Sequence, residues 1–123
     1  MIIGIGTDIA EVSRIAKSIE NIAFKEKVFS PSEIAYCESK ANKAERFAAR
    51  FAAKEAFFKA LGTGWRDGMA FNEVEVINDE IGKPDLNIIG ATAEIIKKRN
   101  IKTIHISLSH VKDVAIAMVV LQE

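Results

Sequence analysis

The segment from Lys43 to Leu61, the longest with a helical pattern, places the strongest constraint on the fold of the chain. The spacing predicts one helix that ends at Gly62, because glycine readily adopts the backbone conformation that terminates helices. Phenylalanines and Leu61 cover one side of this helix, and alanines cover the other. A helix that lacks a broad polar face is buried on several sides. We therefore expect it at the centre of the domain or in an interface between subunits.

The other segments predict a sheet with shorter helices around it. Residues 2–7 are apolar and β-branched, which predicts a buried strand. The last strand is apolar on both faces, so we expect it at the centre of the sheet. Ser30, Pro31 and Glu33 have the spacing of a capping box at a helix start. Further strands are expected over 71–78, 85–89, 103–109 and 114–121, helices over 12–22, 30–40 and 91–99, and a loop over 62–68.

Size and composition define the fold class and exclude some functions. We predict an α+β fold, a single domain over residues 1–123 with a mainly antiparallel sheet packed against helices. The 17 basic residues only balance the 17 acidic ones, whereas nucleic-acid binders usually carry a basic excess. No apolar run approaches the ~20 residues of a membrane span. With Asp8 near the N-terminus and a single cysteine, Cys37, we expect a cytoplasmic protein that binds neither nucleic acid nor membrane.

Two glycines of the first strand invite comparison with the dinucleotide-binding fingerprint. Gly4 and Gly6 have its spacing, but Ile9 stands where the third glycine should be. No parallel strand–helix–strand unit follows, and no phosphate loop of the GxxxxGK type is present. The sequence therefore gives no support to a dinucleotide site.

Two carboxylates are the main candidates for chemistry. Asp8 and Glu11 have the spacing of a capping box, so helix capping competes with a metal or catalytic role for Asp8. Glu55 lies about 40° round the long helix from Phe51. It therefore borders the phenylalanine side, where an ionised carboxylate is costly unless it is paired or bound to a cation. A salt bridge with Lys59, four residues on, is the structural alternative.

The long helix also carries the cations Arg46, Arg50, Lys54 and Lys59. Their ordinary interpretation is solvated side chains that cover apolar surface with their stems. The alternative is an anion site, because these cations border apolar surface and precede a glycine-rich loop. His110, at the end of a strand, would serve the same site or merely finish a turn.

Five segments, taken together, carry a family signature. They are GIGTDIAEVSRI, FSPSEIAYC, RFAARFAAKEAFFKALGTG, NDEIGKPDL and ISLSHVKDVAIAMVVL. In this order, over nearly the whole chain, they resemble the successive motifs of holo-acyl-carrier-protein synthases, the small trimeric branch of the phosphopantetheinyl transferases. The aspartate of the first motif and the glutamate of KEA together form a far more specific signal than either alone.

The resemblance implies a magnesium-dependent enzyme of fatty acid biosynthesis. It would transfer the phosphopantetheine arm of coenzyme A to a serine of apo acyl carrier protein. Asp8 and Glu55 would bind Mg²⁺ together with the coenzyme A pyrophosphate, which suits an ion that prefers oxygen ligands and retains water. Glu55, directly or through a metal-bound water, would be the base, and Lys59 would complete the catalytic set.

The resemblance also implies the substrate contacts and the assembly. Arg14 and Lys17 would form the basic surface that receives the acidic carrier protein. The enzyme would be a homotrimer with sites between neighbouring subunits. Contacts to the nucleotide and its phosphates would come from Lys59, His110, Arg50, Lys54, Gly62, Gly64, Gly82, Lys83 and Pro84.

Two rival classes stay open from the residues alone. One is a magnesium-dependent phosphohydrolase that uses the same carboxylates with water as the nucleophile. The other is a non-enzymatic adaptor whose first helix binds acidic proteins. The products formed with coenzyme A, and the dependence of partner binding on magnesium, would separate them.

Overall fold

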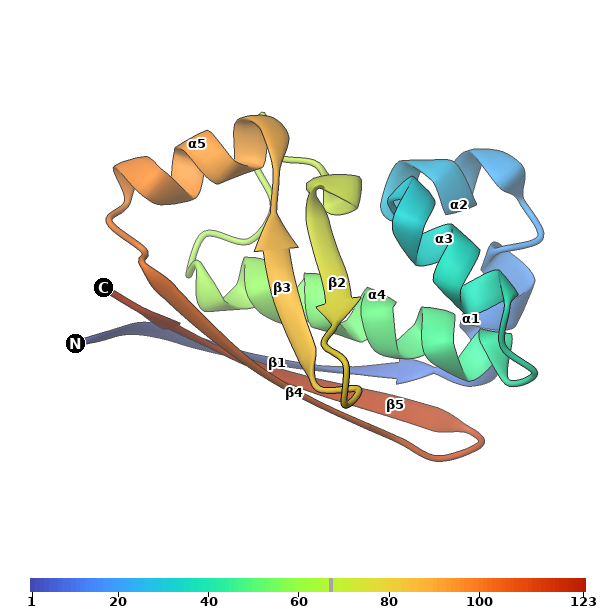
Figure 1. Ribbon diagram of the computed structural model, residues 1–123. Helices are drawn as coiled ribbons and strands as arrows, with labels where there is room; N and C mark the ends of the chain where they lie inside the picture. The colour runs from blue at the N-terminus through green and yellow to red at the C-terminus, as the bar shows by residue number, and fades with distance from the viewer. Residues whose placement is uncertain (67) are drawn as a thin grey trace.

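A long central helix on an antiparallel sheet organises the chain (Figure 1). The computed structural model describes residues 1–66 and 68–123, so Asp67 of the expected 62–68 loop lies outside the described residues. Helix α4 (Lys43–Ala60) lies across a three-stranded sheet of β1 (Ile2–Glu11), β5 (Val114–Gln122) and β4 (Thr103–His110), in that order. Both neighbouring pairs of strands are antiparallel. The predicted α+β class is confirmed.

The remaining elements pack around α4 on the side away from the sheet (Figure 1). The hairpin of β2 and β3 crosses the helix, while α1, α2 and α3 gather at one end of the molecule. The two termini lie together at the other end, where the Glu123 amide donates to the Met1 carbonyl at 3.1 Å. The bounds are α1 (Val12–Ser18), α2 (Ile22–Val28), α3 (Pro31–Glu38), a 3₁₀ turn η1 (Phe71–Glu73), β2 (Val74–Asn78), β3 (Pro84–Ile88) and α5 (Gly90–Lys98).

Helix α4 has the length and the burial that its sequence predicts. It ends at Ala60, and Gly62 follows with φ +81° and an amide that donates to the Lys59 carbonyl at 2.9 Å. Most of its side chains are buried, including the fully buried Phe47 and Phe57. The helix is buried on several sides because the sheet, the hairpin and the small helices all pack on it within one chain.

The prediction that residues 2–7 form a buried strand is wrong in one respect: one face of β1 is exposed. Ile5 and Ile9 are 62% and 65% exposed. The glycines face α4 instead, and a Cβ atom at Gly4 or Gly6 would collide with a carbonyl oxygen of that helix. Because side chains alternate between the faces of a strand, glycines against the helix turn the isoleucines outward. The two glycines thus serve close helix–sheet packing.

The strand also continues past its expected end, and this decides the position of Asp8. Asp8 pairs across the sheet with Ala117, so it lies inside a strand and the capping interpretation is wrong. Helix α1 begins only at Val12, and its N-cap residue Glu11 makes no side-chain cap bond within the described part of the chain. The expected helix over 12–22 is two helices, because the Asn21 side chain accepts the Phe24 amide and starts α2.

Most of the other predicted elements are confirmed to within a few residues. The capping box of Ser30 and Glu33 is present at the start of α3. The predicted strand over 71–78 begins only at Val74, because Phe71–Glu73 form the 3₁₀ turn. The Glu73 carboxylate is turned to α5, where it accepts the amides of Ala91 and Thr92. None of the described helices is long and apolar enough to cross a membrane.

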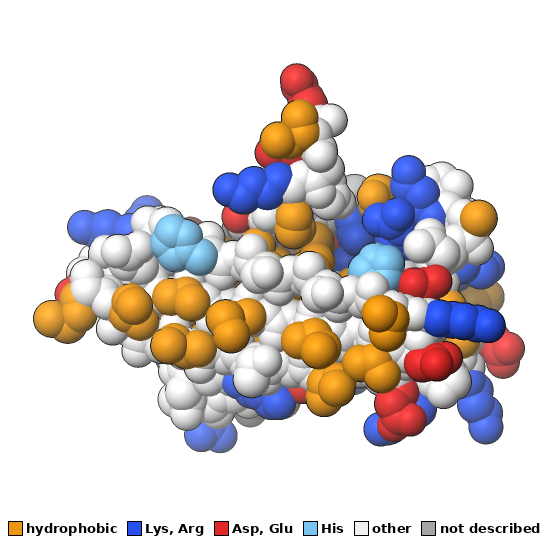
Figure 2. Space-filling model, turned by 90° about the horizontal axis from the view of Figure 1, so that it is seen from below, with side chains coloured by type: hydrophobic (Ala, Val, Ile, Leu, Met, Phe, Trp, Pro, Cys, Tyr) orange, Lys and Arg blue, Asp and Glu red, His pale blue; other side chains and the backbone are white. Residues whose placement is uncertain are grey.

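The face of the sheet opposite α4 is apolar and exposed. Strand β5 is central, as predicted, but Ile116 and Met118 on this side are 46% and 49% exposed. We call this surface the outer face; Figure 2 shows apolar side chains in a band across it. Its members are Ile3, Ile5, Ile9, Ile116 and Met118. The second apolar side of β5 is therefore uncovered within one chain.

Candidate functional site

Asp8 and Lys59 form the first contact of the candidate site. Asp8 lies on the side of β1 that faces α4, with its side chain 15% exposed. The Lys59 Nζ atom donates to Asp8 Oδ1 at 2.9 Å and to the Thr7 carbonyl at 3.2 Å. The hydrogen bond with Asp8 is the main cause that raises the pKa of Lys59. Among the described residues Lys59 pairs with Asp8 and not with Glu55, so the structural alternative for Glu55 is not realised.

Glu55 lies half-buried on the same part of α4, one turn before Lys59. Burial raises the pKa of Glu55, and the negative charge of Asp8 raises it further, against the opposing effect of Lys59. The two carboxylates are thus near enough for one charge to act on the other. We call Asp8, Glu55 and Lys59 the carboxylate cluster.

The carboxylate cluster suits a hard divalent cation. Two repelling carboxylates favour a bound cation, and the Lys59 ammonium already supplies one positive charge on Asp8. Magnesium is usually bound by one or two carboxylates while it retains several waters. The described residues contain no group of three or more histidine, cysteine, aspartate or glutamate side chains that could hold a metal. The two carboxylates of the cluster match the number that magnesium usually takes from a protein.

Lys54 does not belong to a phosphate site. Its side chain is fully buried, and its ammonium donates to Glu33 Oε1 at 2.6 Å and to the carbonyls of Phe71 and Val74. Because each of its three protons has an acceptor inside the protein, the ammonium cannot reach a phosphate from solvent or from a neighbouring subunit. We therefore correct the expectation that Lys54 contacts the nucleotide.

Arg50 joins α4 to the turn between β2 and β3. It is 4% exposed, and its Nη2 atom donates to Asn78 Oδ1 at 2.8 Å. Asn78 in turn donates to the Gly82 carbonyl at 3.1 Å. The guanidinium lies over the Tyr36 ring at 4.3 Å, and its buried Nε atom has no hydrogen-bond partner among the residues that the structure describes. Arg50 thus connects α4 to the β2–β3 hairpin, which also carries Lys83 and Pro84.

A cavity of about 340 Å³ lies between that turn and β4. Lys83 and Pro84 line it from the hairpin, and His105 lines it from the strand. Gly62, Gly64 and Gly82 all have positive φ, and a Cβ atom on any of them would meet open space. Glycine is therefore favoured at these three positions by the positive φ angle and not by close packing.

His110 ends β4 on the side that faces α4. Its Nδ1 atom lies 3.0 Å from Glu45 Oε1, near the first turn of α4. Glu45 and Lys59 are about 21 Å apart along the helix axis at the usual rise per residue. The structure therefore does not bring His110 to the carboxylate cluster of the same chain.

The basic residues expected to receive a partner are available at the surface. Arg14 and Lys17 are exposed on α1, and neither takes part in an ion pair within the described part of the chain. A second cavity, of about 310 Å³, lies beside Arg14 and is also lined by Phe24 and Phe51. Phe51 precedes Glu55 by one helical turn, so this cavity reaches from α1 to a residue next to Glu55 on the surface of α4.

Sequence reasoning missed three partners of these side chains, namely Glu33, Glu45 and Asn78. Each lies at least 21 residues along the chain from the side chain it binds. No local pattern signals such a pairing. Glu33 was recognised only as a member of the capping box, a role that it also fulfils.

Comparison with known proteins identifies the same family as the sequence motifs do. The model of the 4'-phosphopantetheinyl transferase superfamily matches residues 4–119. A holo-[acyl-carrier-protein] synthase of Geobacter sp. (strain M21) is 46% identical over 124 residues, which cover 99% of both chains. The crystal structure of the Neisseria meningitidis synthase superimposes with a TM-score of 0.92 at 34% identity over all of both chains. The Bacillus anthracis synthase, solved in complex with CoA (3',5'-ADP), gives 0.82 at 38% identity and covers 98% of this chain and 96% of its own.

Proposed function

This chain belongs to the 4'-phosphopantetheinyl transferase superfamily, and we propose that it is a holo-acyl-carrier-protein synthase. It transfers the phosphopantetheine arm of coenzyme A to a serine of apo acyl carrier protein, in support of fatty acid biosynthesis. The observation that carries this function is the full-length similarity to synthases, one of them solved with coenzyme A. Relatives of this kind lend no support to the phosphohydrolase and adaptor alternatives.

The proposed reaction is a displacement at phosphorus. The serine oxygen forms a bond to the phosphorus that carries the pantetheine arm, and the bond from that phosphorus to the bridging oxygen breaks. Adenosine bisphosphate leaves with the electron pair, and the serine proton passes to Glu55, either directly or through a water molecule.

Magnesium is part of the proposal, with Asp8 and Glu55 as its protein ligands. When bound there, the ion would offset the negative charge that grows on the pyrophosphate as the phosphorus–oxygen bond breaks. Support comes from the carboxylate cluster, in which the positively charged Lys59 ammonium already binds Asp8. In this proposal Lys59 neutralises Asp8 before substrate binds and contacts a phosphate afterwards.

Intact-mass analysis of apo carrier protein tests the function directly. Incubation with this protein, coenzyme A and magnesium should add the mass of the phosphopantetheine arm. An unchanged carrier mass, or cleavage of coenzyme A that needs no carrier, would contradict it. Dephospho-coenzyme A as the donor tests the proposed contacts to the ribose phosphate. Lys59 and His110 are the proposed contacts to the phosphates. The full set of proposed contacts to the nucleotide and its phosphates, without Lys54, is Lys59, His110, Arg50, Gly62, Gly64, Gly82, Lys83 and Pro84.

We propose that α1 is the docking surface for the carrier protein. The R14E/K17E variant should raise the KM for carrier protein about tenfold or more and leave the KM for coenzyme A unchanged, because exposed charges steer association. Added salt should imitate this effect in the wild type. The matched control is K97E/K98E, which reverses two exposed cations at the end of α5. Equal effects of the two variants would place docking elsewhere.

We propose a homotrimer in which the outer face is covered by neighbouring subunits. An exposed apolar band of this kind usually marks an interaction surface. The separation of His110 from the carboxylate cluster supports an active site shared between subunits. In the I9E/I116E variant two carboxylates would stand opposite each other across β1 and β5. Light scattering should show three chains for the wild type and for the control I22E, and one chain for I9E/I116E.

The proposed location is the cytoplasm, and the proposed unit is one domain over residues 1–123. Cys37 is a free, buried thiol, which is consistent with a reducing compartment. Recovery of the protein in the membrane fraction of cells would contradict this location. A stable, active fragment after limited proteolysis would contradict the single domain.

A further inference from the structure

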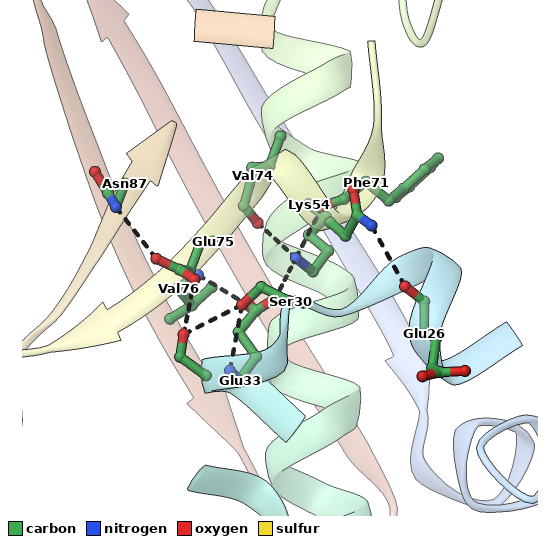
Figure 3. A network of polar contacts seen from close by, with 11 residues as sticks. Glu26, Ser30, Glu33, Lys54, Phe71, Val74, Glu75, Val76 and Asn87 are labelled. Carbon is green, nitrogen blue, oxygen red and sulfur yellow. Dashed lines mark hydrogen bonds and ion pairs between the residues drawn. The ribbon is translucent and has the colours of Figure 1, made fainter. Parts of the chain in front are cut away.

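A buried ion pair joins three elements beneath the surface of the molecule (Figure 3). Lys54 of α4 and Glu33 of α3 are both fully buried, and the Nζ–Oε1 distance is 2.6 Å. The ammonium also donates to the carbonyl of Phe71, at 2.9 Å, and to that of Val74. These two carbonyls stand at the beginning and just beyond the end of η1. The ion pair therefore holds the 3₁₀ turn against the long helix.

Glu33 extends the network to the hairpin. Its Oε1 atom accepts the Ser30 amide and its Oε2 atom accepts the Val76 amide, both at 2.9 Å. Every proton of the ammonium and both oxygens of the carboxylate thus have partners. Burial lowers the pKa of Lys54, and the charge of Glu33 opposes that shift. A network with all its members satisfied rigidifies the elements that it joins.

The position of Lys54 on α4 connects this network with the carboxylate cluster. Consecutive helical residues are separated by about 100° round the axis. Between Lys54 and Glu55, at about 60° and 40° from Glu55, lie Phe58 and Phe51. The Phe71 ring packs on both, with ring centroids 4.9 Å from Phe58 and 6.5 Å from Phe51. Lys54 thus holds the main chain of the residue whose ring packs on the phenylalanines beside Glu55.

We propose that the Lys54–Glu33 pair is a positioning device for the transfer reaction. The pair fixes Phe71, and Phe71 in turn holds Phe51 and Phe58 in place. These two rings lie beside Glu55 on α4 and would keep its carboxylate in position near Asp8. An apolar pair of similar volume often stabilises a core as well as a buried ion pair. Only a multiple donor, however, can bind the two carbonyls at the ends of η1. The activity part of this proposal rests on the proposed function, whereas its structural part does not.

The test uses the E33Q/K54M variant, in which both charges are removed and the volumes are nearly kept. We expect kcat for transfer to fall about a hundredfold, as a misplacement of about 1 Å can cause. The KM for coenzyme A should change little, because Lys54 is sealed from substrate. K54M alone leaves Glu33 buried without its partner and is the harsher variant. The matched control is K43M, which removes an exposed cation of the same helix that lies 3.4 Å from Glu38.

Two measurements without magnesium or coenzyme A test the structural part. Hydrogen exchange should become faster in the amides of residues 71–76, whose order depends on the network. The single tryptophan, Trp65, donates to the Met69 carbonyl at 2.8 Å just before this segment. Its fluorescence should therefore change in E33Q/K54M and stay unchanged in K43M.

The outcomes separate this proposal from the proposed function. A folded E33Q/K54M variant with slow transfer, an unchanged KM and faster exchange supports positioning. Wild-type kcat, or slow transfer without a change in exchange and fluorescence, overturns it. Failure of both charge-removing variants to fold also overturns it, since the pair would then serve the whole fold. If the wild type transfers nothing, the proposed function fails, and faster exchange over 71–76 in E33Q/K54M would still support the structural part.

Discussion

Replacement of Glu55 by glutamine is expected to abolish transfer and leave the fold intact. The amide has nearly the same volume beside Phe51, so no cavity forms. It lacks the negative charge needed to bind magnesium strongly and to accept the serine proton. General bases contribute about a hundred- to ten-thousandfold to a rate, so E55Q should lose at least that factor. The measurement is the rate of modified carrier protein over a magnesium titration.

Melting curves of E55Q separate loss of chemistry from loss of fold. A carboxyl group whose pKa is raised by folding favours the protonated form in the folded state. Above that raised pKa, the charged group of the metal-free wild type lowers the free energy of unfolding. The metal-free E55Q variant should therefore melt at the same temperature as the wild type or higher, and any difference should vanish at acid pH.

The matched control for this variant is E94Q, which changes an exposed glutamate of α5. It should leave both turnover and melting unchanged. Near-normal turnover of E55Q at low magnesium would remove Glu55 from the site. An ion pair with Lys59 would not then explain Glu55 either, because Lys59 is bound to Asp8.

Substitution of Gly6 by alanine should destabilise the protein more than any surface change. The added Cβ atom would collide with the carbonyl oxygen of Ala56, so α4 and β1 must separate. The Cβ position is fixed by the main chain of β1 and the oxygen belongs to the main chain of α4, so neither atom can rotate away. Overpacking of this kind costs about 3 kcal/mol or more, which corresponds to roughly 10 °C in Tm for a domain of this size. The shift of α4 should also impair transfer, because β1 carries Asp8 and α4 carries Glu55.

The matched control for the Gly6 prediction is G62A. Gly62 has φ +81° and open space around a Cβ atom, so alanine there suffers only from the left-handed backbone conformation. That conformation costs roughly 1–2 kcal/mol. Thermal melting of both variants gives the comparison. A loss in G6A no larger than that in G62A would show that the contact between β1 and α4 adapts without cost.

The ends of helices could be predicted from the sequence, because they depend on residues that are close neighbours along the chain. The end of α4 before Gly62 and the capping box of Ser30 and Glu33 each depend on residues within a few positions. The central place of β5 followed from its apolar character. Asp8 and Glu55 were singled out as a pair through the resemblance, since neither pattern alone distinguished chemistry from capping or an ion pair.

Tertiary structure decided what alternation and helical spacing leave open. The two-residue period of β1 defines two faces, but only the approach of α4 to Gly6 shows that the isoleucines lie on the uncovered one. Lys54 and Lys59 of the long helix looked alike in the sequence. Their partners distinguish them: Lys54 binds Glu33, 21 residues away, whereas Lys59 binds Asp8, 51 residues away. Such pairings depend on how the chain folds back on itself, because side-chain chemistry determines what a group can bind and tertiary packing determines which partner it meets.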